Sequence, residues 1–406
     1  MIYQLHELHH ASLIPARLWA GATMALYGNP LNPFSHSVMS RVMVASADLL
    51  LRTTRRYAKP EFGLTETMVL GRPVAVGEEK VVEKPFCNLL RFRRDTDVRQ
   101  PIVLVVAPLS GHHATLLRDT VRSLIQDHDV YITDWKDART VPLSMGPFHF
   151  SDYVTYIQEF IRRLGPDLHV VSVCQPTAPV LAAISLMAAD SEPAPLTMTM
   201  MGGPIDTRKS PTSVNTFATE QSIAWFENKV IDSVPVHYPG HRRKVCPGFM
   251  LLAGFMSMNP ERHFGSHRDY FYHLVRGDGE SAEAHRRFYD EYNAVMDLPA
   301  EYYLDTVKMV FQEHQLPTGK MVVMGKPVTP SAITKTALFT IEGELDDISG
   351  SGQTHAAHEL CSGIPASGRR QLTAQGAGHY GIFSGRRYRQ VIYPQIRDFI
   401  GSYPGR

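Results

Sequence analysis

The sequence predicts an α/β fold with a doubly wound, mostly parallel sheet and a helical insertion. Three observations support this prediction. Short aliphatic runs alternate with helical segments between residues 102 and 200, the alternation stops between 206 and 332, and a second group of apolar runs follows. Strands that alternate with helices of this length are typical of parallel sheets, whose strands are buried on both faces.

The individual strands and helices are expected in the following chain order. Residues 1–65 are expected to be helical and irregular, and apolar residues at helical spacing predict a helix over 39–51 that ends in arginines. Short strands are expected between 66 and 95, for example over 86–93. Further strands are predicted at 102–106, 130–132, 169–173, 196–200, 337–341 and 371–373, and helices at 114–126, 153–164, 179–189 and 389–400.

The change of pattern after residue 205 predicts how the chain is divided. Residues 206–332 are rich in aromatic residues, methionine and histidine, and they show no alternation of strands and helices. A helical insertion between two runs of sheet is typical of a cap or lid domain. We therefore expect an N-terminal helical extension at 1–65, a first part of the α/β core at 66–205, the cap at 206–332 and a second part of the core at 333–406.

The composition is that of an ordinary globular protein and argues against several classes of function. Apolar residues make up 44% of the chain and charged residues 20%, and 41 basic residues balance 40 acidic ones. This balance does not indicate the extended basic surface that binds nucleic acid, and the basic clusters at 242–244 and 386–387 are short. The paired histidines at 9–10 and 112–113 lack spaced partners, so we expect no metal site.

We expect neither a secretory signal nor a membrane-spanning segment. The first residues, MIYQLHELHH, lack a basic start and a continuous apolar stretch, and no window reaches the roughly 18 apolar residues of a transmembrane helix. The four cysteines, Cys87, Cys174, Cys246 and Cys361, are scattered and form no CxxC pair. Neither a zinc site nor a disulfide framework is indicated, which predicts a protein of the reducing cytoplasm.

Three candidate catalytic residues occur in a consistent order along the chain. Cys174 comes directly after the predicted strand 169–173 and before a helix, Asp346 follows a strand of the second group, and His379 lies in a glycine-rich loop. In an α/β-hydrolase the nucleophile sits on the sharp turn between a buried strand and a helix, the acid follows a later strand and the histidine comes last. This order predicts an α/β-hydrolase fold in which Cys174 attacks, His379 accepts the proton and Asp346 orients the imidazole.

Each of these residues also has a plainer interpretation. The turn reads Ser172-Val173-Cys174-Gln175-Pro176 instead of G-x-S-x-G, and a free cysteine is most often a small core residue. Proline two residues after the cysteine is compatible with the first turn of a helix. Asp347 directly follows Asp346 and is the alternative acid, while His379 alone fits a loop histidine bonded to its own backbone. The three residues together favour catalysis.

Five blocks of the sequence carry a further likeness. They read MIYQLHELHHASLIPARLWA, APLSGHHATLLRDTV, VVSVCQPTAPVLAAI, TIEGELDDISGSGQTHAAHELC and GAGHYGIFSGRRYR. These blocks resemble the intracellular polyhydroxybutyrate depolymerases, and the resemblance spans nearly the whole chain. The family's nucleophile, acid and histidine fall on Cys174, Asp346 and His379, with Asp347 as the fallback acid. The family is similar to the polyhydroxyalkanoate synthases, which share a Cys-Asp-His arrangement on the same fold.

The resemblance implies a carboxylic ester hydrolase that cleaves amorphous poly(3-hydroxybutyrate) through an acyl-thioester and releases 3-hydroxybutyrate or its oligomers. In the predicted fold the oxyanion accepts hydrogen bonds from the amide of Gln175 and from Leu109 or Ser110, which follow the strand 102–106. No bound cofactor is expected, although the thiol of coenzyme A is an alternative to water as acyl acceptor. The expected partners are the polymer and the granule surface, and the expected location is the cytoplasm, at the granules.

Two other functions stay open at this point. The same triad would serve a polyhydroxyalkanoate synthase-like acyltransferase, and a non-catalytic granule-associated protein would bind the polymer without turnover. The complete set of three residues argues against the second alternative, because a coat protein needs none of them. The aromatic and methionine-rich cap could form an apolar tunnel for the polymer, or its side chains could simply pack on the core.

Overall fold

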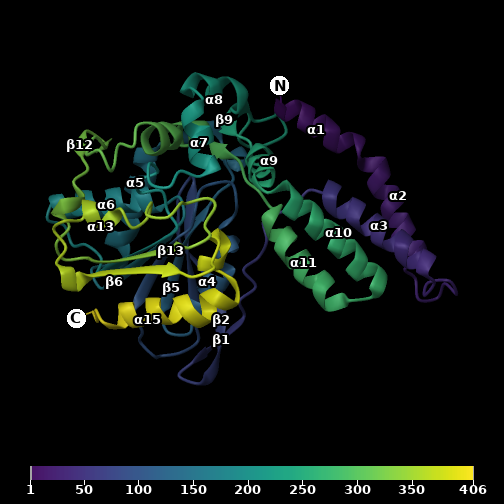
Figure 1. Cartoon of the computed structure of the whole chain (residues 1–406), viewed down its shortest axis with the longest axis horizontal. Helices are drawn as coiled ribbons and strands as arrows, with labels where there is room; N and C mark the ends of the chain where they lie inside the picture. The colour runs from purple at the N-terminus through teal and green to yellow at the C-terminus, as the bar shows by residue number, and fades with distance from the viewer. Residues whose placement is uncertain (1, 406) are drawn as a thin grey trace.

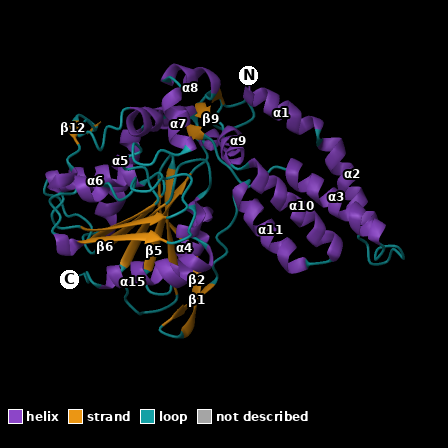
Figure 2. Ribbon diagram, viewed as in Figure 1, coloured by secondary structure: helices purple, strands orange, loops and turns teal. Residues whose placement is uncertain are grey.

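A nine-stranded, mostly parallel sheet lies at the centre of the molecule (Figure 1, Figure 2). The computed structural model describes residues 2–405. The strands lie in the order β1-β2-β3-β5-β4-β6-β7-β13-β14. Their bounds are β1 Glu66–Val69, β2 Arg72–Glu83, β3 Cys87–Arg94, β4 Ile102–Val106, β5 Asp129–Trp135, β6 Leu168–Val173, β7 Thr197–Met201, β13 Ala337–Gly343 and β14 Arg369–Ala374.

The topology of this sheet determines where a ligand can bind. The six strands from β5 to β14 run parallel, and β1, β2 and β3 form an antiparallel edge. The strand order reverses at β4, because β5 lies on one side of it and β6 on the other. Ligands of open α/β sheets bind at the carboxyl ends of the strands beside such a reversal. The architecture is the α/β-hydrolase fold, which confirms the fold class predicted from the sequence.

Helices cover both faces of the sheet because the strands carry apolar side chains on both. All residues of β6 and nearly all of β4 are buried. α5 and α6 pack together on one face, and α4 and α15 pack together on the other (Figure 1). These helices are α4 Arg118–Leu124, α5 Phe150–Leu164, α6 Thr177–Ala189 and α15 Tyr393–Gly401. The shorter helical turns are η1 Ala114–Leu117, η2 Ala138–Thr140, η3 Leu143–Met145, η5 Pro330–Ala332, α13 Ala357–Leu360, η6 Ala366–Gly368, η7 His379–Ile382, α14 Gly385–Arg387 and η8 Tyr388–Ile392.

Residues 206–332 are mainly helical, but they also contain two small sheets, β10-β9-β8 and β11-β12. Strands of two or three residues are too short to show an alternating pattern, so the sequence did not reveal them. The elements of this segment are α7 Ser213–Glu220, α8 Ile223–Lys229, β8 Asp232–Ser233, β9 Lys244–Cys246, α9 Gly248–Met258, α10 Pro260–Arg276, α11 Gly279–Tyr292, β10 Leu298–Pro299, α12 Ala300–Thr306, the π-helix η4 Val307–Gln312, β11 Val322–Val323 and β12 Lys326–Pro327. α12 packs back on α5, where Tyr302 stacks on Tyr153.

Five helices project from the sheet as an arm (Figure 1). They are α1 Ile2–Ser12, α2 Ile14–Tyr27, α3 Val38–Thr54, α10 and α11, and we call them the helical arm. Within it α2 packs on α3, α3 on α10, and α10 on α11. Across residues 2–405, every helix is too short or too polar to span a lipid bilayer.

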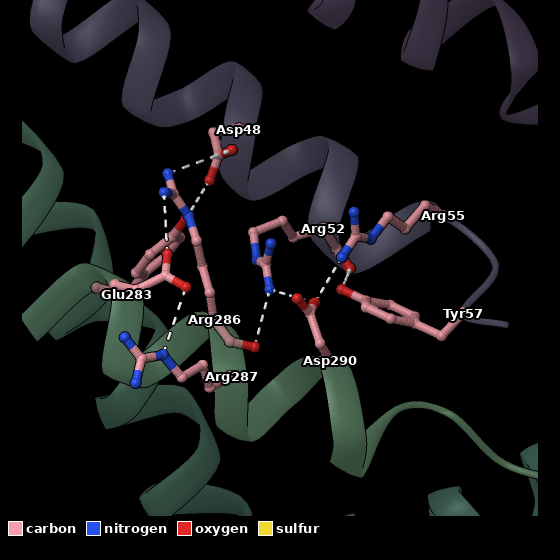
Figure 3. Close-up of polar contacts among 9 residues, drawn as sticks. Asp48, Arg52, Arg55, Tyr57, Glu283, Arg286, Arg287 and Asp290 are labelled. Atoms are coloured by element: carbon pink, nitrogen blue, oxygen red, sulfur yellow. Dashed lines mark hydrogen bonds and ion pairs between the residues drawn. The ribbon is translucent and has the colours of Figure 1, made fainter. Parts of the chain in front are cut away.

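Ion pairs attach α3 to α11 inside the helical arm (Figure 3). Arg52 of α3 and Arg55, which directly follows this helix, each place a guanidinium nitrogen 2.5 Å from Asp290 Oδ1 on α11. Nearby, Arg286 Nε donates to the hydroxyl of Tyr270 at 2.8 Å, and that hydroxyl in turn donates to Asp48. Arg52 is almost buried, so its charge depends on these partners more than that of an exposed arginine would.

A buried polar cluster anchors the start of α9, the helix between the sheet and the arm. The backbone amide of Gly248 donates to Asp297 Oδ1 at 2.9 Å, and the hydroxyl of Tyr3 donates to Asp297 Oδ2 at 2.8 Å. Asp137 pairs with Arg139 at 2.7 Å, and burial together with the charge of Asp297 raises the pKa of Asp137 to about 6. The cluster therefore ties α1, the loop after β5 and the first turn of α9 to one point.

Candidate active site

Cys174 stands on a sharp turn at the carboxyl end of β6. Its φ of 68° lies in the left-handed region, which residues other than glycine rarely adopt. The turn is held because the Cys174 amide donates to the carbonyl of Met201 at 2.7 Å and the Thr177 amide donates to the Cys174 carbonyl at 3.2 Å. α6 begins at Thr177, so a buried strand, a strained residue and a helix follow in direct succession. This is the local geometry of an α/β-hydrolase nucleophile.

Accessibility separates Cys174 from the other three cysteines. Cys87, Cys246 and Cys361 are buried free thiols, whereas Cys174 is half-buried and lines a cavity. Burial raises the pKa of Cys361 to about 12 and also raises those of Cys87 and Cys246. A buried thiol with a raised pKa does not form the reactive thiolate. Cys174 is thus the thiol that a substrate can reach.

Two glycines after β7 make room for the turn, and sequence reasoning missed them. A β-carbon at Gly203 would lie 1.9 Å from Thr177 Oγ1, and one at Gly202 would lie 2.6 Å from Ile382 Cδ1 and 3.3 Å from His379 Cε1. Gly202 also has a φ of 54°. The usual turn has glycines on either side of the nucleophile, whereas here the neighbouring strand supplies the space. The signal was the Gly-Gly pair directly after the run 196–201.

His379 and Asp346 form a buried hydrogen-bonded pair. His379 Nδ1 lies 2.8 Å from Asp346 Oδ2, and the two side chains are only 4% and 1% exposed. Asp346 Oδ1 accepts the backbone amides of Ile348 and Ser349 at 2.9 and 2.8 Å, which fixes the carboxylate. Since Nδ1 is committed to Asp346, the second ring nitrogen of His379 is left for Cys174, with which the imidazole also interacts.

The two adjacent aspartates have different partners. Asp347 Oδ2 accepts a hydrogen bond from Asn259 Nδ2 at 2.8 Å on the surface between α9 and α10. The carboxylate beside His379 belongs to Asp346. The structure therefore brings together Cys174, His379 and the first of the two candidate acids.

The charges around His379 oppose the effect of its burial. Burial alone lowers the pKa of His379, but the negative charges of Cys174 and Asp346 and the hydrogen bond to Asp346 outweigh it. They hold the pKa of His379 well above its usual value of 6.5. A histidine with a raised pKa holds a proton more readily, which suits it for acid–base work beside Cys174.

The three residues named as oxyanion donors line the same cavity as Cys174 and His379. Leu109 and Ser110 follow β4, and Gln175 follows the nucleophile at the start of the helical turn. The Leu109 amide donates to Oε1 of the Gln175 side chain at 3.3 Å, so these two residues contact each other. An oxyanion above Cys174 would therefore have to replace the Gln175 side-chain oxygen as the acceptor of the Leu109 amide.

The cavity above Cys174 has a volume of about 730 Å³ and a largely apolar wall. Residues of the inserted segment form much of this wall, including Trp225 and Phe226 of α8, Met250 and Met258 of α9, and Tyr303 of α12. A volume of this size suits a drug-sized organic molecule, and an apolar wall binds substrates rich in hydrocarbon. Within residues 2–405, no cluster of histidine, cysteine and carboxylate side chains is arranged to bind a metal ion.

Comparison with known proteins gives the family. Residues 202–404 match the family described as "PHB de-polymerase C-terminus", where PHB stands for polyhydroxybutyrate, and the match covers half of the 406 residues. The chain belongs to this family. Membership in the PHB de-polymerase family makes the chain a carboxylic ester hydrolase, as the sequence blocks had implied. No curated protein matches the chain in sequence.

Solved structures resemble the chain only remotely. A thermophilic esterase from Thermogutta terrifontis shares 11% identity at a TM-score of 0.42, covering 84% of this chain and 98% of its own. A hydrolase from Pseudomonas aeruginosa PA01 shares 12% identity at a TM-score of 0.46, covering 80% and 98%. A monoacylglycerol lipase from Paleococcus ferrophilus shares 13% identity at a TM-score of 0.44, covering 75% and 96%.

Proposed function

We propose that the chain hydrolyses poly(3-hydroxybutyrate) through a Cys174–His379–Asp346 triad and an acyl-thioester intermediate. One observation carries the proposal: Cys174, which lines the cavity, adopts a left-handed backbone conformation beside a buried histidine–aspartate pair. A core cysteine needs neither the strained φ nor an imidazole partner. The family match supports a polymeric 3-hydroxybutyrate ester as the substrate.

The first half of the reaction forms the thioester. His379 takes the proton of the Cys174 thiol, and the sulfur attacks the carbonyl carbon of an ester bond in the polymer. Asp346 holds the imidazole in one orientation and stabilises its positive charge. The backbone amides of Gln175 and of Leu109 or Ser110 donate to the oxyanion of the tetrahedral intermediate. When this intermediate collapses, the alkoxide of the next polymer unit leaves and takes the proton from His379.

The second half restores the thiol. His379 removes a proton from water, and the hydroxide attacks the thioester carbonyl. Collapse of the second intermediate releases a 3-hydroxyacyl carboxylate, and the sulfur recovers its proton. The thiol of coenzyme A is an alternative acceptor at this step, in which case the product is a new thioester. No resident cofactor takes part in either half.

The apolar cavity suits a chain of methyl-bearing ester units, which present hydrocarbon and carbonyl oxygens but no hydrogen-bond donors. Trp225, Phe226 and Met258 supply the apolar wall. Because this polymer is insoluble, we place the protein at the surface of polyhydroxybutyrate granules in the cytoplasm.

Turnover of amorphous poly(3-hydroxybutyrate) granules by the purified protein tests the proposal. We expect release of soluble 3-hydroxybutyrate or its oligomers, loss of about three to four orders of magnitude in rate for Cys174→Ala, and partial activity for Cys174→Ser. Mass spectrometry of the quenched enzyme should find 3-hydroxybutyryl units on the peptide that contains Cys174. Added coenzyme A distinguishes hydrolysis from thiolysis by its product.

Unchanged release by Cys174→Ala, with a folded protein by circular dichroism, would exclude this mechanism. Polymer formation from 3-hydroxybutyryl-CoA, without release from granules, would replace hydrolysis with synthesis.

A further inference from the structure

The outer side of the helical arm exposes an unusual amount of apolar surface. Large apolar side chains are exposed from Leu5 of α1 to Met39 of α3. We define the apolar arm face by six of them, Leu8, Ile14, Leu18, Trp19, Leu26 and Leu31, which are between 48% and 89% exposed. Exposed apolar side chains gathered in one part of a molecule mark a site of interaction, whereas scattered single ones need no explanation.

The composition of α2 points to a function beyond folding. Every exposed residue of α2 is apolar, and its buried side meets α3 through small residues such as Ala20 and Thr23. Its one charged side chain, Arg17, turns inward and donates to the carbonyls of Thr54 and His10 at 2.8 and 3.0 Å. A surface helix normally has polar residues on its solvent side, and a helix that is apolar all round is normally buried. The solvent side of α2 therefore has the composition of a covered surface.

The charge pattern indicates what covers this surface. No aspartate or glutamate occurs between Glu7 and Asp48, so the region carries arginine, histidine and amide groups but no carboxylate. A polyester presents methyl groups and carbonyl oxygens, which accept hydrogen bonds and repel carboxylates. Trp19 is 58% exposed, and an indole carries one N–H group that can donate to such carbonyls.

Ion pairs and hydrogen bonds connect the helices of the apolar arm face to the helices that line the cavity. α3 is held to α11 by the pairs of Arg52 and Arg55 with Asp290 (Figure 3). α10 follows α9, whose residue Met258 lines the cavity, and Asn259 between these helices donates to Asp347 beside the triad acid. A surface that holds the arm therefore also holds the cavity wall near it.

We infer that the apolar arm face docks the enzyme on the surface of solid poly(3-hydroxybutyrate). This inference rests on the proposed function, since it takes the polymer that the triad is proposed to cleave as the docking partner. Burial of Leu18, Trp19 and Leu26 against the polymer provides the affinity, and the absence of carboxylates removes repulsion. Docking raises the local concentration of polymer chains at the cavity without taking part in bond cleavage.

Binding is measured separately from cleavage in the inactive Cys174→Ala background. Sedimentation with amorphous granules compares that protein with a version that also carries Leu18→Gln, Trp19→Gln and Leu26→Gln. The matched control replaces three apolar residues exposed elsewhere, Met68→Gln, Leu70→Gln and Val322→Gln. We expect the affinity for granules to fall at least about ten-fold in the arm variant and to stay unchanged in the control.

In the active background, the arm variant should lose about ten-fold in rate on granules but keep its rate on a soluble 3-hydroxybutyrate trimer. Equal granule binding by arm and control variants would overturn the inference. So would a wild-type dimer that the arm substitutions dissociate in analytical ultracentrifugation, or binding to phosphatidylglycerol vesicles in place of granules. A wild type that binds granules through the arm but cleaves neither substrate would refute the proposed function and leave the docking inference standing.

Discussion

The hydroxyl oxygen of Thr177 lies 1.9 Å from the point where a β-carbon on Gly203 would be. Thr177 opens α6 directly after the Cys174 turn, and Gly203 follows the neighbouring strand β7. The missing side chain of one residue is therefore the space that the other occupies. The glycine of the neighbouring strand thus makes room for the first residue of the helix that follows the Cys174 turn.

Gly203→Ala should accordingly destabilise the protein. The new methyl group has no free space, so we expect the free energy of unfolding to fall by about 1–3 kcal/mol, with loss of activity because the Cys174 turn shifts. Gly265→Ala in α10 is the control, since nothing lies within 4 Å of its β-carbon. That variant should gain about 0.5–1 kcal/mol. Urea unfolding measures both, and equal stability of the two variants would contradict the packing argument.

Asp346→Asn should remove both activity and a pH-dependent part of the stability. In the proposed mechanism this carboxylate orients His379, so its loss should lower kcat by about 10⁴. Because the folded-state pKa of His379 is raised above 6.5, its contribution is complete below that pH and is lost as the pH rises through the raised pKa. The stability difference between wild type and variant should therefore be largest near pH 6 and shrink toward pH 9.

Asp347→Asn is the matched control for that variant. Its carboxylate contacts Asn259 on the surface and not His379, so we expect activity within about two-fold of wild type. Urea unfolding across the pH range and kcat on a soluble ester measure both variants. Equal losses for Asp346→Asn and Asp347→Asn would mean that the two acids share the role.

Asp290→Asn should loosen α3 from α11. It removes the charged partner of Arg52, whose side chain is 9% exposed, while Asp290 itself is 43% exposed. Solvent screening at Asp290 reduces the cost to about 1–2 kcal/mol. Hydrogen exchange should show faster exchange for the amides of α3 and no change in the central strands.

Arg287→Ala provides the comparison on the same helix. This arginine is 77% exposed and meets Glu283 at 3.5 Å, so its loss should change stability by no more than about 0.5 kcal/mol. Unchanged protection of α3 in Asp290→Asn would show that apolar packing alone holds the two helices together.

The parallel strands could be predicted from sequence because burial on both faces leaves continuous apolar runs. The run 102–106 coincides with β4, and the other core strands differ from their predicted ends by a few residues. The short strands β8 to β12 leave no such pattern. The helical arm was also underestimated, since α1 and α2 carry apolar residues on their solvent side and therefore lack the usual helical alternation.

The candidate site also contains residues that the sequence could predict and residues that it could not. Chain order alone pointed to Cys174 and His379, because each follows a recognisable element. It could not separate Asp346 from Asp347, because the contacts that distinguish them appear only in the folded chain: Asp346 bonds His379 and the amides of Ile348 and Ser349, whereas Asp347 bonds Asn259. Gly202 and Gly203 act through contacts with residues far along the chain, so only the three-dimensional structure reveals their role.

Trp225→Ala should separate recognition of a polymer chain from catalysis on a small ester. The indole lines the cavity and packs edge-on against Phe217 and Phe226, with ring centroids 5.7 and 5.2 Å away. We expect KM for a soluble 3-hydroxybutyrate oligomer to rise about ten-fold, because an aromatic contact of this size contributes about 1–2 kcal/mol. The value of kcat/KM for an acetate ester, which is smaller and fills less of the cavity, should change by less than about two-fold.

Trp19→Ala is the matched control for this prediction, because its indole lies on the apolar arm face and not in the cavity. That variant should keep wild-type kinetics on both soluble substrates. If Trp225→Ala left KM for the oligomer unchanged, the cavity wall formed by α8 would have no part in binding the polymer. If kcat/KM fell equally for both soluble substrates, the role of the indole would be to stabilise the fold of residues 206–332 and not to bind the substrate.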